Sequence, residues 1–187
     1  LFMYKSVGVI GGGSWGTTLA DLLAKKGHSV TLWAYENELV REMQDRRENS
    51  LYLQGIRLAD NLCFTDSLQD VVSDKQLLLF VVPSQVLSGV LAATIPYIQA
   101  GAILVSASKG IEVDTLKLMS QVYEELLSPE HYRRFAVLSG PSFAREVALE
   151  MPTAVVAAAA DSFVAKEVQD AFTCSYFRVY TNSDVTG

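Results

Sequence analysis

Hydrophobic residues in this chain gather in short continuous runs, and between the runs apolar side chains recur at three- and four-residue spacing. Uninterrupted apolar runs are typical of strands buried on both faces of a sheet, whereas the wider spacing is typical of helices that cover such a sheet. The runs predict strands over residues 6–10, 29–34, 62–65, 77–82, 102–107, 135–138, 154–160 and 176–180.

The wider spacing predicts helices between these strands. Leu19, Leu22 and Leu23 share one face of the first helix, and Gly27 follows as the residue that commonly ends a helix. The predicted helices cover residues 17–26, 36–47, 67–72, 85–95, 115–127, 142–150 and 162–172, and residues 48–61 are predicted to form a loop. The alternation predicts one α/β domain over residues 1–187, Rossmann-like, with a doubly wound and mostly parallel sheet.

Gly11, Gly13 and Gly16 form the pattern G-x-G-x-x-G between the first predicted strand and the first helix. At this place the pattern is typical of a loop that binds the pyrophosphate of a dinucleotide. The first glycine permits a tight turn, the second lets the backbone approach the ligand, and the third lets helix and strand pack closely. The backbone N–H groups of Ser14 and Trp15 are expected to face the same phosphates. A glycine turn that binds nothing is the alternative.

Glu36 lies about 20 residues beyond the glycine pattern, where an acid commonly binds the ribose 2′-hydroxyl of the cofactor. Tyr35 beside it could stack on the adenine ring. Residues 34–37 contain no Arg or Lys to bind a 2′-phosphate, which favours NAD over NADP without excluding either. Alternatively, Glu36 is only the first acid of the following helix, placed there by the helix dipole.

Three further loops follow predicted strands at the edge where a doubly wound sheet binds ligands. Residues 83–85 are expected to border the nicotinamide, and Lys109 brings an ammonium group to the same edge. Gly140 and Ser142 are candidates for binding an anion or a polyol. The alternatives are a solvated lysine, an ordinary glycine turn and an early helix residue.

Charge and apolar run length exclude some classes of protein. With 21 acidic and 15 basic residues, the net charge is −6, which argues against non-specific nucleic-acid binding. Residues 77–82 and 154–160, the longest apolar runs, are far shorter than the roughly 20 residues that span a bilayer. We expect no secretory signal, because only a few residues precede the first predicted strand and no charged region leads a long apolar one.

The metal-ligating residue types are few and scattered. Cys63 and Cys174 stand far apart among apolar residues, which predicts two buried thiols in a reducing cytoplasm. His28 and His131 are equally isolated, so the sequence shows no metal-ligand spacing and no metal is expected.

Taken together, the loops resemble those of the NAD(P)-dependent glycerol-3-phosphate dehydrogenases of bacterial type. The resemblance combines the tryptophan in the glycine loop, the Ser-Lys-Gly loop and a Gly-Pro-Ser-Phe-Ala segment. The matching segments run in order along the chain, at residues 9–17, 30–33, 80–84, 108–112, 138–144 and 179–182.

This resemblance implies reversible reduction of dihydroxyacetone phosphate to sn-glycerol 3-phosphate with NAD or NADP, a reaction that serves phospholipid synthesis. It implies that Ser14, Trp15, Tyr35 and Ala144 contact the cofactor, that Lys109 contacts both cofactor and substrate, and that Gly140 and Ser142 contact the substrate. It also implies a cytoplasmic protein that is a homodimer at full length.

In the resembling family the catalytic lysine and a helical second domain follow the segment that matches residues 181–187. The resemblance therefore implies a cofactor domain of a longer enzyme, with the general acid or base beyond residue 187. Two alternatives stay open: another two-domain Rossmann dehydrogenase that acts on a hydroxyacid or sugar acid, and a stand-alone dinucleotide-binding module.

We predict that Tyr35→Arg raises the affinity for NADPH relative to NADH, because arginine supplies a cation beside the expected 2′-phosphate. Titration of the variant and the unmodified protein with both cofactors measures the ratio. An unchanged ratio would count against the expected position of the adenosine ribose.

Overall fold

The computed structural model describes residues 6–186, and in this part of the chain the elements follow the predicted alternation. The strands are β1 (Ser6–Ile10), β2 (Ser29–Trp33), β3 (Leu62–Thr65), β4 (Leu77–Phe80), β5 (Ile103–Ser106), β6 (Phe135–Ser139), β7 (Thr153–Ala158) and β8 (Phe177–Asn182). The helices are α1 (Ser14–Lys25), α2 (Asn37–Arg46), α3 (Leu68–Val72), α4 (Ser84–Thr94), α5 (Met119–Leu126), α6 (Pro129–Tyr132), α7 (Ala144–Ala148), α8 (Ser162–Phe172) and the 3-10 turn η1 (Ile95–Tyr97).

Within residues 6–186 the strands form one eight-stranded sheet in the order β3-β2-β1-β4-β5-β6-β7-β8. Every neighbouring pair is parallel except β6 and β7. The order runs outward in both directions from β1, so β1 and β4 are neighbours at the point where the direction of winding reverses. The predicted doubly wound, mostly parallel sheet is therefore confirmed.

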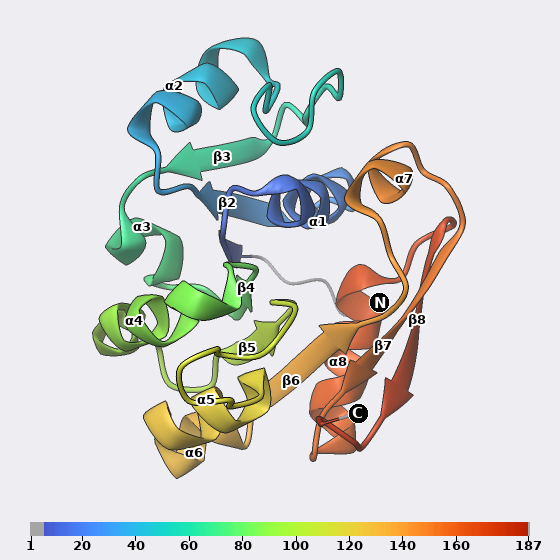
Figure 1. Ribbon diagram of the computed structural model, residues 1–187. Coiled ribbons are helices and arrows are strands. Elements are labelled where there is room, and N and C mark those ends of the chain that lie inside the picture. The colour runs from blue at the N-terminus through green and yellow to red at the C-terminus, as the bar shows by residue number, and fades with distance from the viewer. Residues whose placement is uncertain (1–5, 187) are drawn as a thin grey trace.

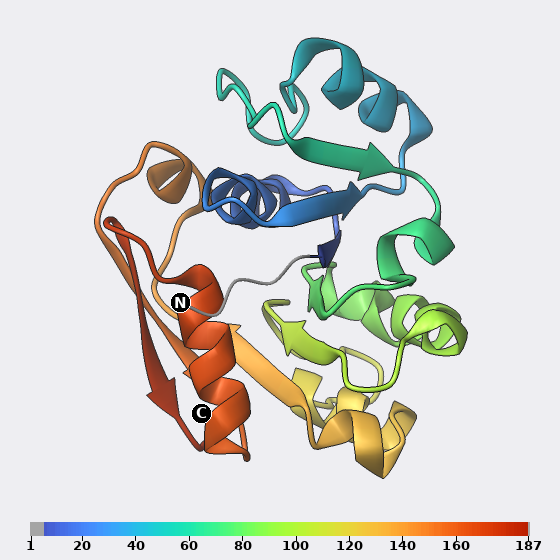
Figure 2. The ribbon, with the colours of Figure 1, turned by 180° about the vertical axis from the view of Figure 1, so that it is seen from behind.

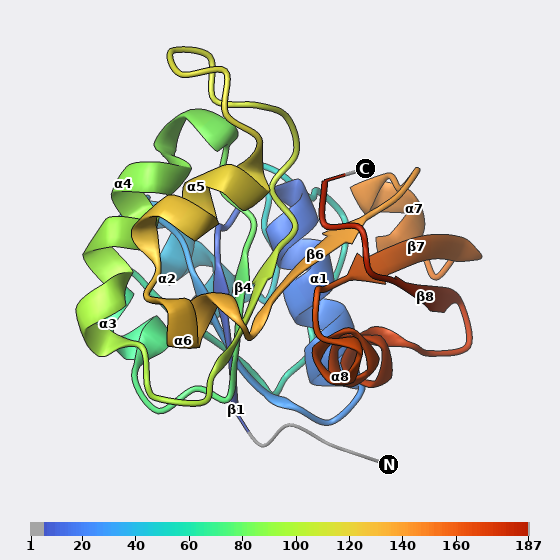
Figure 3. The same ribbon diagram turned by 90° about the horizontal axis from the view of Figure 1, so that it is seen from below.

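Helices cover both faces of the sheet (Figures 1 and 3). The helices α1, α2, α7 and α8 share one apolar core with the sheet, and α3, α4 and α5 share the other. Successive side chains of β4 enter opposite cores: Leu77 and Leu79 face the α1 side, and Leu78 and Phe80 face the α4 side. All four are fully buried, which explains why this strand is an unbroken apolar run.

Several element boundaries differ from the prediction for local reasons. Helix α1 begins inside the glycine pattern rather than after it. Helix α5 begins later than predicted because residues 111–118 fold back on themselves, with a bridge between Ile111 and Leu118. The short helix α6 was not predicted, although Ser128 caps it with its side chain and Pro129 stands at its first position.

The prediction of two buried thiols was wrong for Cys63, which is exposed, while Cys174 is half-buried. Cys63 lies on the edge strand β3, where side chains alternate between the core and solvent. Leu62 and Phe64 take the inward positions and Cys63 points outward. Nothing in an isolated four-residue apolar run distinguishes an edge strand from a central one.

The sequence predicted neither a membrane-spanning helix nor a metal site, and both expectations concern the described residues 6–186. Over that range no helix has the length and apolar character needed to cross a membrane. Likewise, the described side chains include no group of His, Cys, Asp or Glu arranged to hold a metal ion. The expectation about a secretory signal falls on residues 1–5, which lie outside the described part.

Lys26, the residue after α1, joins this helix to the far end of α8. Its ammonium group donates hydrogen bonds to the backbone oxygens of Asp170 at 2.9 Å, Ala171 at 2.7 Å and Thr173 at 2.6 Å. These are carbonyls at the C-terminal end of α8, where unpaired oxygens and the helix dipole favour a cation. Since α8 covers β7 and β8 (Figure 2), this contact ties the first half of the chain to the last strands.

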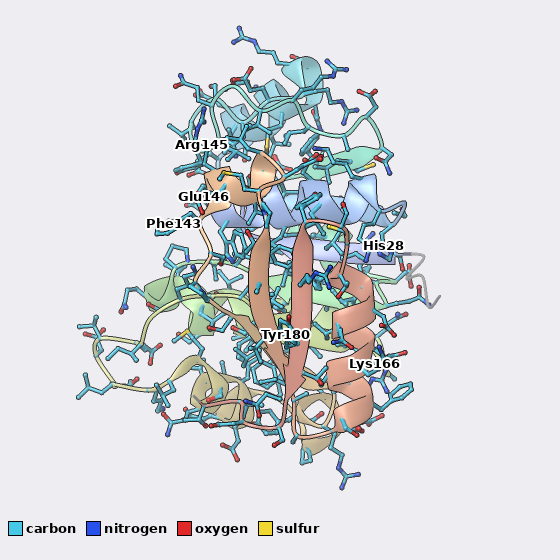
Figure 4. All side chains as sticks on the ribbon, turned by 90° about the vertical axis from the view of Figure 1, so that its right-hand side faces the viewer. His28, Phe143, Arg145, Glu146, Lys166 and Tyr180 are labelled. Atoms are coloured by element: carbon cyan, nitrogen blue, oxygen red, sulfur yellow. The ribbon has the colours of Figure 1, made fainter. Side chains whose placement is uncertain are left out.

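We predict that Lys26→Met lowers the free energy of unfolding by about 1–2 kcal/mol, because it leaves carbonyl oxygens of α8 without a donor. Urea denaturation measures the change. Lys166→Met is the matched control: Lys166 also lies on α8 (Figure 4), but its contacts are exposed, an ion pair with Asp170 and a hydrogen bond to the Gln169 side chain. That control should cost about 0.5 kcal/mol or less, and equal losses in the two variants would contradict the role assigned to Lys26.

Candidate dinucleotide-binding site

A pocket of about 750 Å³ opens at the carboxyl ends of β1, β4 and β5. This is the edge at which the reversal of winding separates neighbouring loops and leaves a crevice. It is lined by Gly11, Gly12, Gly13, Ser14, Trp15, Gly16, Trp33, Tyr35, Glu36, Tyr52, Val81, Val82, Pro83, Val86, Val90, Ala107, Ser108 and Lys109. The whole glycine pattern, Tyr35 and Lys109 thus meet in one place, as expected from the sequence.

The three glycines of the pattern have different surroundings. Gly11 has a φ of +132°, and a Cβ atom there would lie 2.4 Å from the Val81 oxygen. A Cβ atom on Gly16 would lie 1.9 Å from the Gly11 oxygen. A Cβ atom on Gly13 would meet nothing within 4 Å. The first and third glycines are therefore required by the fold, whereas the second leaves open space beside the pocket.

The N-terminus of α1 has the features of an anion-binding site. Gly13 occupies the N-cap position, so no side chain caps the helix, and the first turn contains no acid. The first N–H groups of a helix have no partner inside it, and the helix dipole adds positive potential at this end. A phosphate group in the pocket could accept hydrogen bonds from them.

Glu36 reaches the pocket from the N-cap position of α2, and its side chain does not cap that helix. Tyr52 donates a hydrogen bond from its hydroxyl to Oε1 of Glu36 at 3.0 Å, and this bond raises the pKa of Tyr52 above its usual value. Tyr52 lies in the loop between α2 and β3, where the sequence showed no pattern. Sequence reasoning therefore missed Tyr52, because only the folded chain brings that loop to the pocket.

Tyr35 lies at the same rim and is 80% exposed. Its ring meets the edge of Trp33 at a centroid distance of 6.4 Å, and Trp33 is itself held by a hydrogen bond to the Asp66 oxygen. An exposed aromatic ring braced on one side has a face free for stacking. This geometry suits the predicted contact with adenine, which stays a prediction.

Lys109 lies between the pocket and the loop that carries Ser142. Its ammonium nitrogen is 5.4 Å from the centroid of the Trp15 ring and donates a hydrogen bond to the Ser142 backbone oxygen at 3.1 Å. Trp15 also packs against Phe177, with ring centroids 6.4 Å apart. The indole therefore both lines the pocket and packs against the core.

Gly140, Ser142 and Ala144 lie beside the pocket and not in its lining. A Cβ atom on Gly140 would come within 3.0 Å of Val155, so the glycine lets this loop pass close to β7. The Ser142 hydroxyl turns back to the Gly140 oxygen at 3.4 Å. The Ala144 oxygen accepts a hydrogen bond from the Thr18 hydroxyl at 3.2 Å, which joins α7 to α1. Their contacts to substrate or cofactor stay predictions.

Hydrogen bonds from two side chains, Gln85 and Arg145, connect the loops around the pocket. Gln85 donates a hydrogen bond to the Ile111 oxygen at 2.9 Å and accepts one from the Val113 N–H at 3.0 Å. The loop that begins with Lys109 projects past the sheet (Figure 3), and Gln85 fixes its base. On the other side, Arg145 of α7 (Figure 4) donates to the Gln54 oxygen at 2.9 Å.

The chain matches the model of a known protein family. Residues 6–165 match the family model described as NAD-dependent glycerol-3-phosphate dehydrogenase N-terminus. The chain belongs to this family. The resemblance and the fold expected from it are thereby confirmed.

The curated proteins similar to this chain are named as glycerol-3-phosphate dehydrogenases. The chain is 62% identical over 185 residues to a glycerol-3-phosphate dehydrogenase [NAD(P)+] of Geobacter sp. (strain M21), an alignment that covers 99% of this chain and 55% of the relative. A protein of the same name from Geobacter sulfurreducens is 61% identical over the same shares of both chains. The chain therefore spans about half the length of these relatives.

Solved structures show the same similarity. A glycerol-3-phosphate dehydrogenase from Coxiella burnetii is 35% identical with a TM-score of 0.87, covering 98% of this chain and 55% of that chain. A ketopantoate reductase from Ralstonia eutropha, at 20% identity and a TM-score of 0.71, covers 97% of this chain and 58% of that one. At that identity the likeness shows the fold alone and carries no argument about a substrate.

We predict that Gly13→Ala leaves the fold stable and weakens dinucleotide binding at least about tenfold, equivalent to about 1.4 kcal/mol. The added methyl group meets no protein atom within 4 Å, and it would occupy space that we expect the pyrophosphate to fill. Thermal unfolding and titration with NADH measure the two effects.

Gly16→Ala is the contrasting variant. Its methyl group would collide with the Gly11 oxygen, so we expect a loss of about 3 kcal/mol or more in the free energy of unfolding. Unchanged NADH affinity in Gly13→Ala, or equal stability of both variants, would contradict the assigned roles of these glycines.

Proposed function

We propose that this chain is the cofactor-binding part of an NAD(P)-dependent glycerol-3-phosphate dehydrogenase, which reversibly reduces dihydroxyacetone phosphate to sn-glycerol 3-phosphate. The observation that carries the proposal is the position of Lys109, between the glycine-loop pocket at Trp15 and the loop of Ser142. A cation there can contact a dinucleotide in the pocket and a small phosphorylated ketone beside it. The names of the relatives support the same reaction.

Several residues fit a dinucleotide. The uncapped N-terminus of α1 and the open side of Gly13 fit the pyrophosphate, with the N–H groups of Ser14 and Trp15 directed to it. Tyr35 and Glu36 fit the adenosine end, and Pro83 lines the pocket on the side of β4 expected to hold the nicotinamide. When bound, the nicotinamide supplies or accepts the hydride.

The choice of cofactor follows from the charge at the adenosine end. Tyr52 holds one carboxylate oxygen of Glu36, and the other can accept a hydrogen bond from a ribose hydroxyl. A 2′-phosphate at the same place would face this carboxylate, and residues 34–37 offer no cation. We therefore propose a preference for NAD over NADP.

Lys109 is proposed to bind and orient the substrate. Its ammonium group keeps two further protons for hydrogen bonds when one is donated to the Ser142 oxygen. Gly140 and Ser142 stand beside it and are proposed to border the substrate. The proton for the new hydroxyl group is assigned to a lysine beyond residue 187, so Lys109 is not the general acid.

The proposal extends to the assembly state and the cellular location of the full-length protein. The full-length protein is expected to be a cytoplasmic homodimer that binds no nucleic acid. Light scattering during size-exclusion chromatography measures the assembly state, and a monomeric mass at working concentration would contradict the dimer.

The test is an assay of the full-length protein with dihydroxyacetone phosphate and either NADH or NADPH. Cofactor oxidation is expected, faster with NADH at limiting concentration. No oxidation with either cofactor would overturn the proposal, and turnover of hydroxyacids or sugar acids instead would favour the alternative dehydrogenase. Cofactor binding without any turnover would favour the stand-alone module.

We predict that Lys109→Met raises the KM for dihydroxyacetone phosphate about tenfold or more, because a charge-assisted hydrogen bond is lost. Lys117→Met is the control, since Lys117 belongs to the same projecting loop but pairs with Glu125. Steady-state kinetics of both variants should show the defect only in the first.

A further inference from the structure

Asn49 is a fully buried polar side chain in the loop between α2 and β3, with 0% exposure. Its amide nitrogen donates hydrogen bonds to the Gly12 backbone oxygen at 2.9 Å and to the Thr17 hydroxyl at 2.8 Å. The Thr17 hydroxyl in turn donates to the same Gly12 oxygen at 3.2 Å. Asn49, Thr17 and Gly12 thus form a closed triangle of hydrogen bonds directly beneath the glycine loop.

The side-chain oxygen of Asn49 is used as well, because it accepts the backbone N–H of Tyr52 at 2.9 Å. A buried amide destabilises a fold unless its donors and acceptor are paired, and here both are. Tyr52 holds Glu36 through its hydroxyl. One side chain therefore connects the phosphate end of the pocket with the ribose end.

The triangle acts on the most flexible part of the binding loop. Gly12 and Gly13 are consecutive glycines, and glycine loses more backbone freedom on ordering than any other residue. The Gly12 oxygen and the Gly13 N–H belong to one planar peptide group, so holding the oxygen also fixes the direction of the N–H. Gly13 is the glycine whose side is open to the pocket.

We propose that Asn49 is a positioning residue for cofactor binding, which with Thr17 holds the Gly12–Gly13 peptide in the orientation that receives the pyrophosphate. The proposal rests on the proposed function and extends it to a residue that touches no ligand. The loop is ordered before the cofactor arrives, so binding does not have to supply the ordering free energy.

Asn61 provides a matched comparison within the same loop. Its side-chain nitrogen donates to the Ala24 backbone oxygen at 2.9 Å, at the far end of α1 from the glycine pattern. Both side chains anchor the loop between α2 and β3 to the α1 region, Asn61 through the Ala24 oxygen and Asn49 through the Gly12 oxygen and the Thr17 hydroxyl, but only Asn49 touches the glycine loop. Asn61 is exposed and Asn49 is buried, so the two variants need not lose equal stability, and ligand affinity is the measurement that separates their roles.

The experiment measures the dissociation constants of NADH and ADP-ribose for the full-length protein and its variants, with thermal unfolding in parallel. Asn49→Leu keeps the side-chain shape and removes the hydrogen bonds, and Asn61→Leu is the control. We expect Asn49→Leu to weaken both ligands about tenfold, as for one or two lost hydrogen bonds. Asn61→Leu should lower the unfolding temperature and leave both constants unchanged.

Thr17→Val keeps the inference testable if Asn49→Leu does not fold. It replaces the hydroxyl by a methyl group, and we expect it to weaken NADH about fivefold, whereas Thr17→Ser should restore binding. At saturating NADH, the KM for dihydroxyacetone phosphate should not change in these variants, because the triangle lies at the pyrophosphate.

The outcomes separate this inference from the proposed function. If the unmodified protein binds neither NADH nor ADP-ribose, the proposed function fails and this inference fails with it. If the unmodified protein binds both, and Asn49→Leu or Thr17→Val loses stability without losing affinity, the inference alone is overturned. A parallel loss for NADH and ADP-ribose, with Thr17→Ser like the unmodified protein, supports it.

Discussion

The close contact between Gly11 and Gly16 is the constraint on which the rest of the site depends. The Gly11 oxygen lies so close to Gly16 that a Cβ atom on Gly16 would be only 1.9 Å from it. No residue other than glycine fits at this position. This contact sets α1 directly against the end of β1 and points its uncapped N-terminus into the crevice. A larger residue at either position would move the helix, and the anion-binding end would move with it.

The order of strands turns this local contact into a binding site. Because β4 lies next to β1 and β5 lies next to β4, the segments that follow these strands start at the same edge as the glycine loop. Val81 packs against Gly11, and Lys109 reaches the Trp15 ring from the end of β5. Residues far apart in the chain are brought together because parallel neighbours end at the same edge of a sheet. Strand β6 is parallel to β5, so Gly140 follows it at this same edge, and the antiparallel β7 then passes Gly140 and runs away from the edge.

Much of the fold could be predicted because its signals are local. The buried run of β4 and the leucine face of α1 depend only on hydrophobic spacing, and the glycine pattern depends only on a strand followed by a helix. The predictions failed where a longer-range contact decides. Residues 111–118 fold back on themselves, which shortens α5, and Cys63 is exposed because its strand lies at the edge of the sheet.

The sequence by itself determined the class of the fold, the phosphate-binding loop and the family resemblance, since each is written in neighbouring residues. The tertiary structure alone decided what surrounds that loop. The pairing of Tyr52 with Glu36, the position of Lys109 on Trp15 and the anchoring of Gly12 by Asn49 each join segments that are separated in the sequence. Such polar contacts depend on distance and direction in space, and one-dimensional spacing carries no record of either.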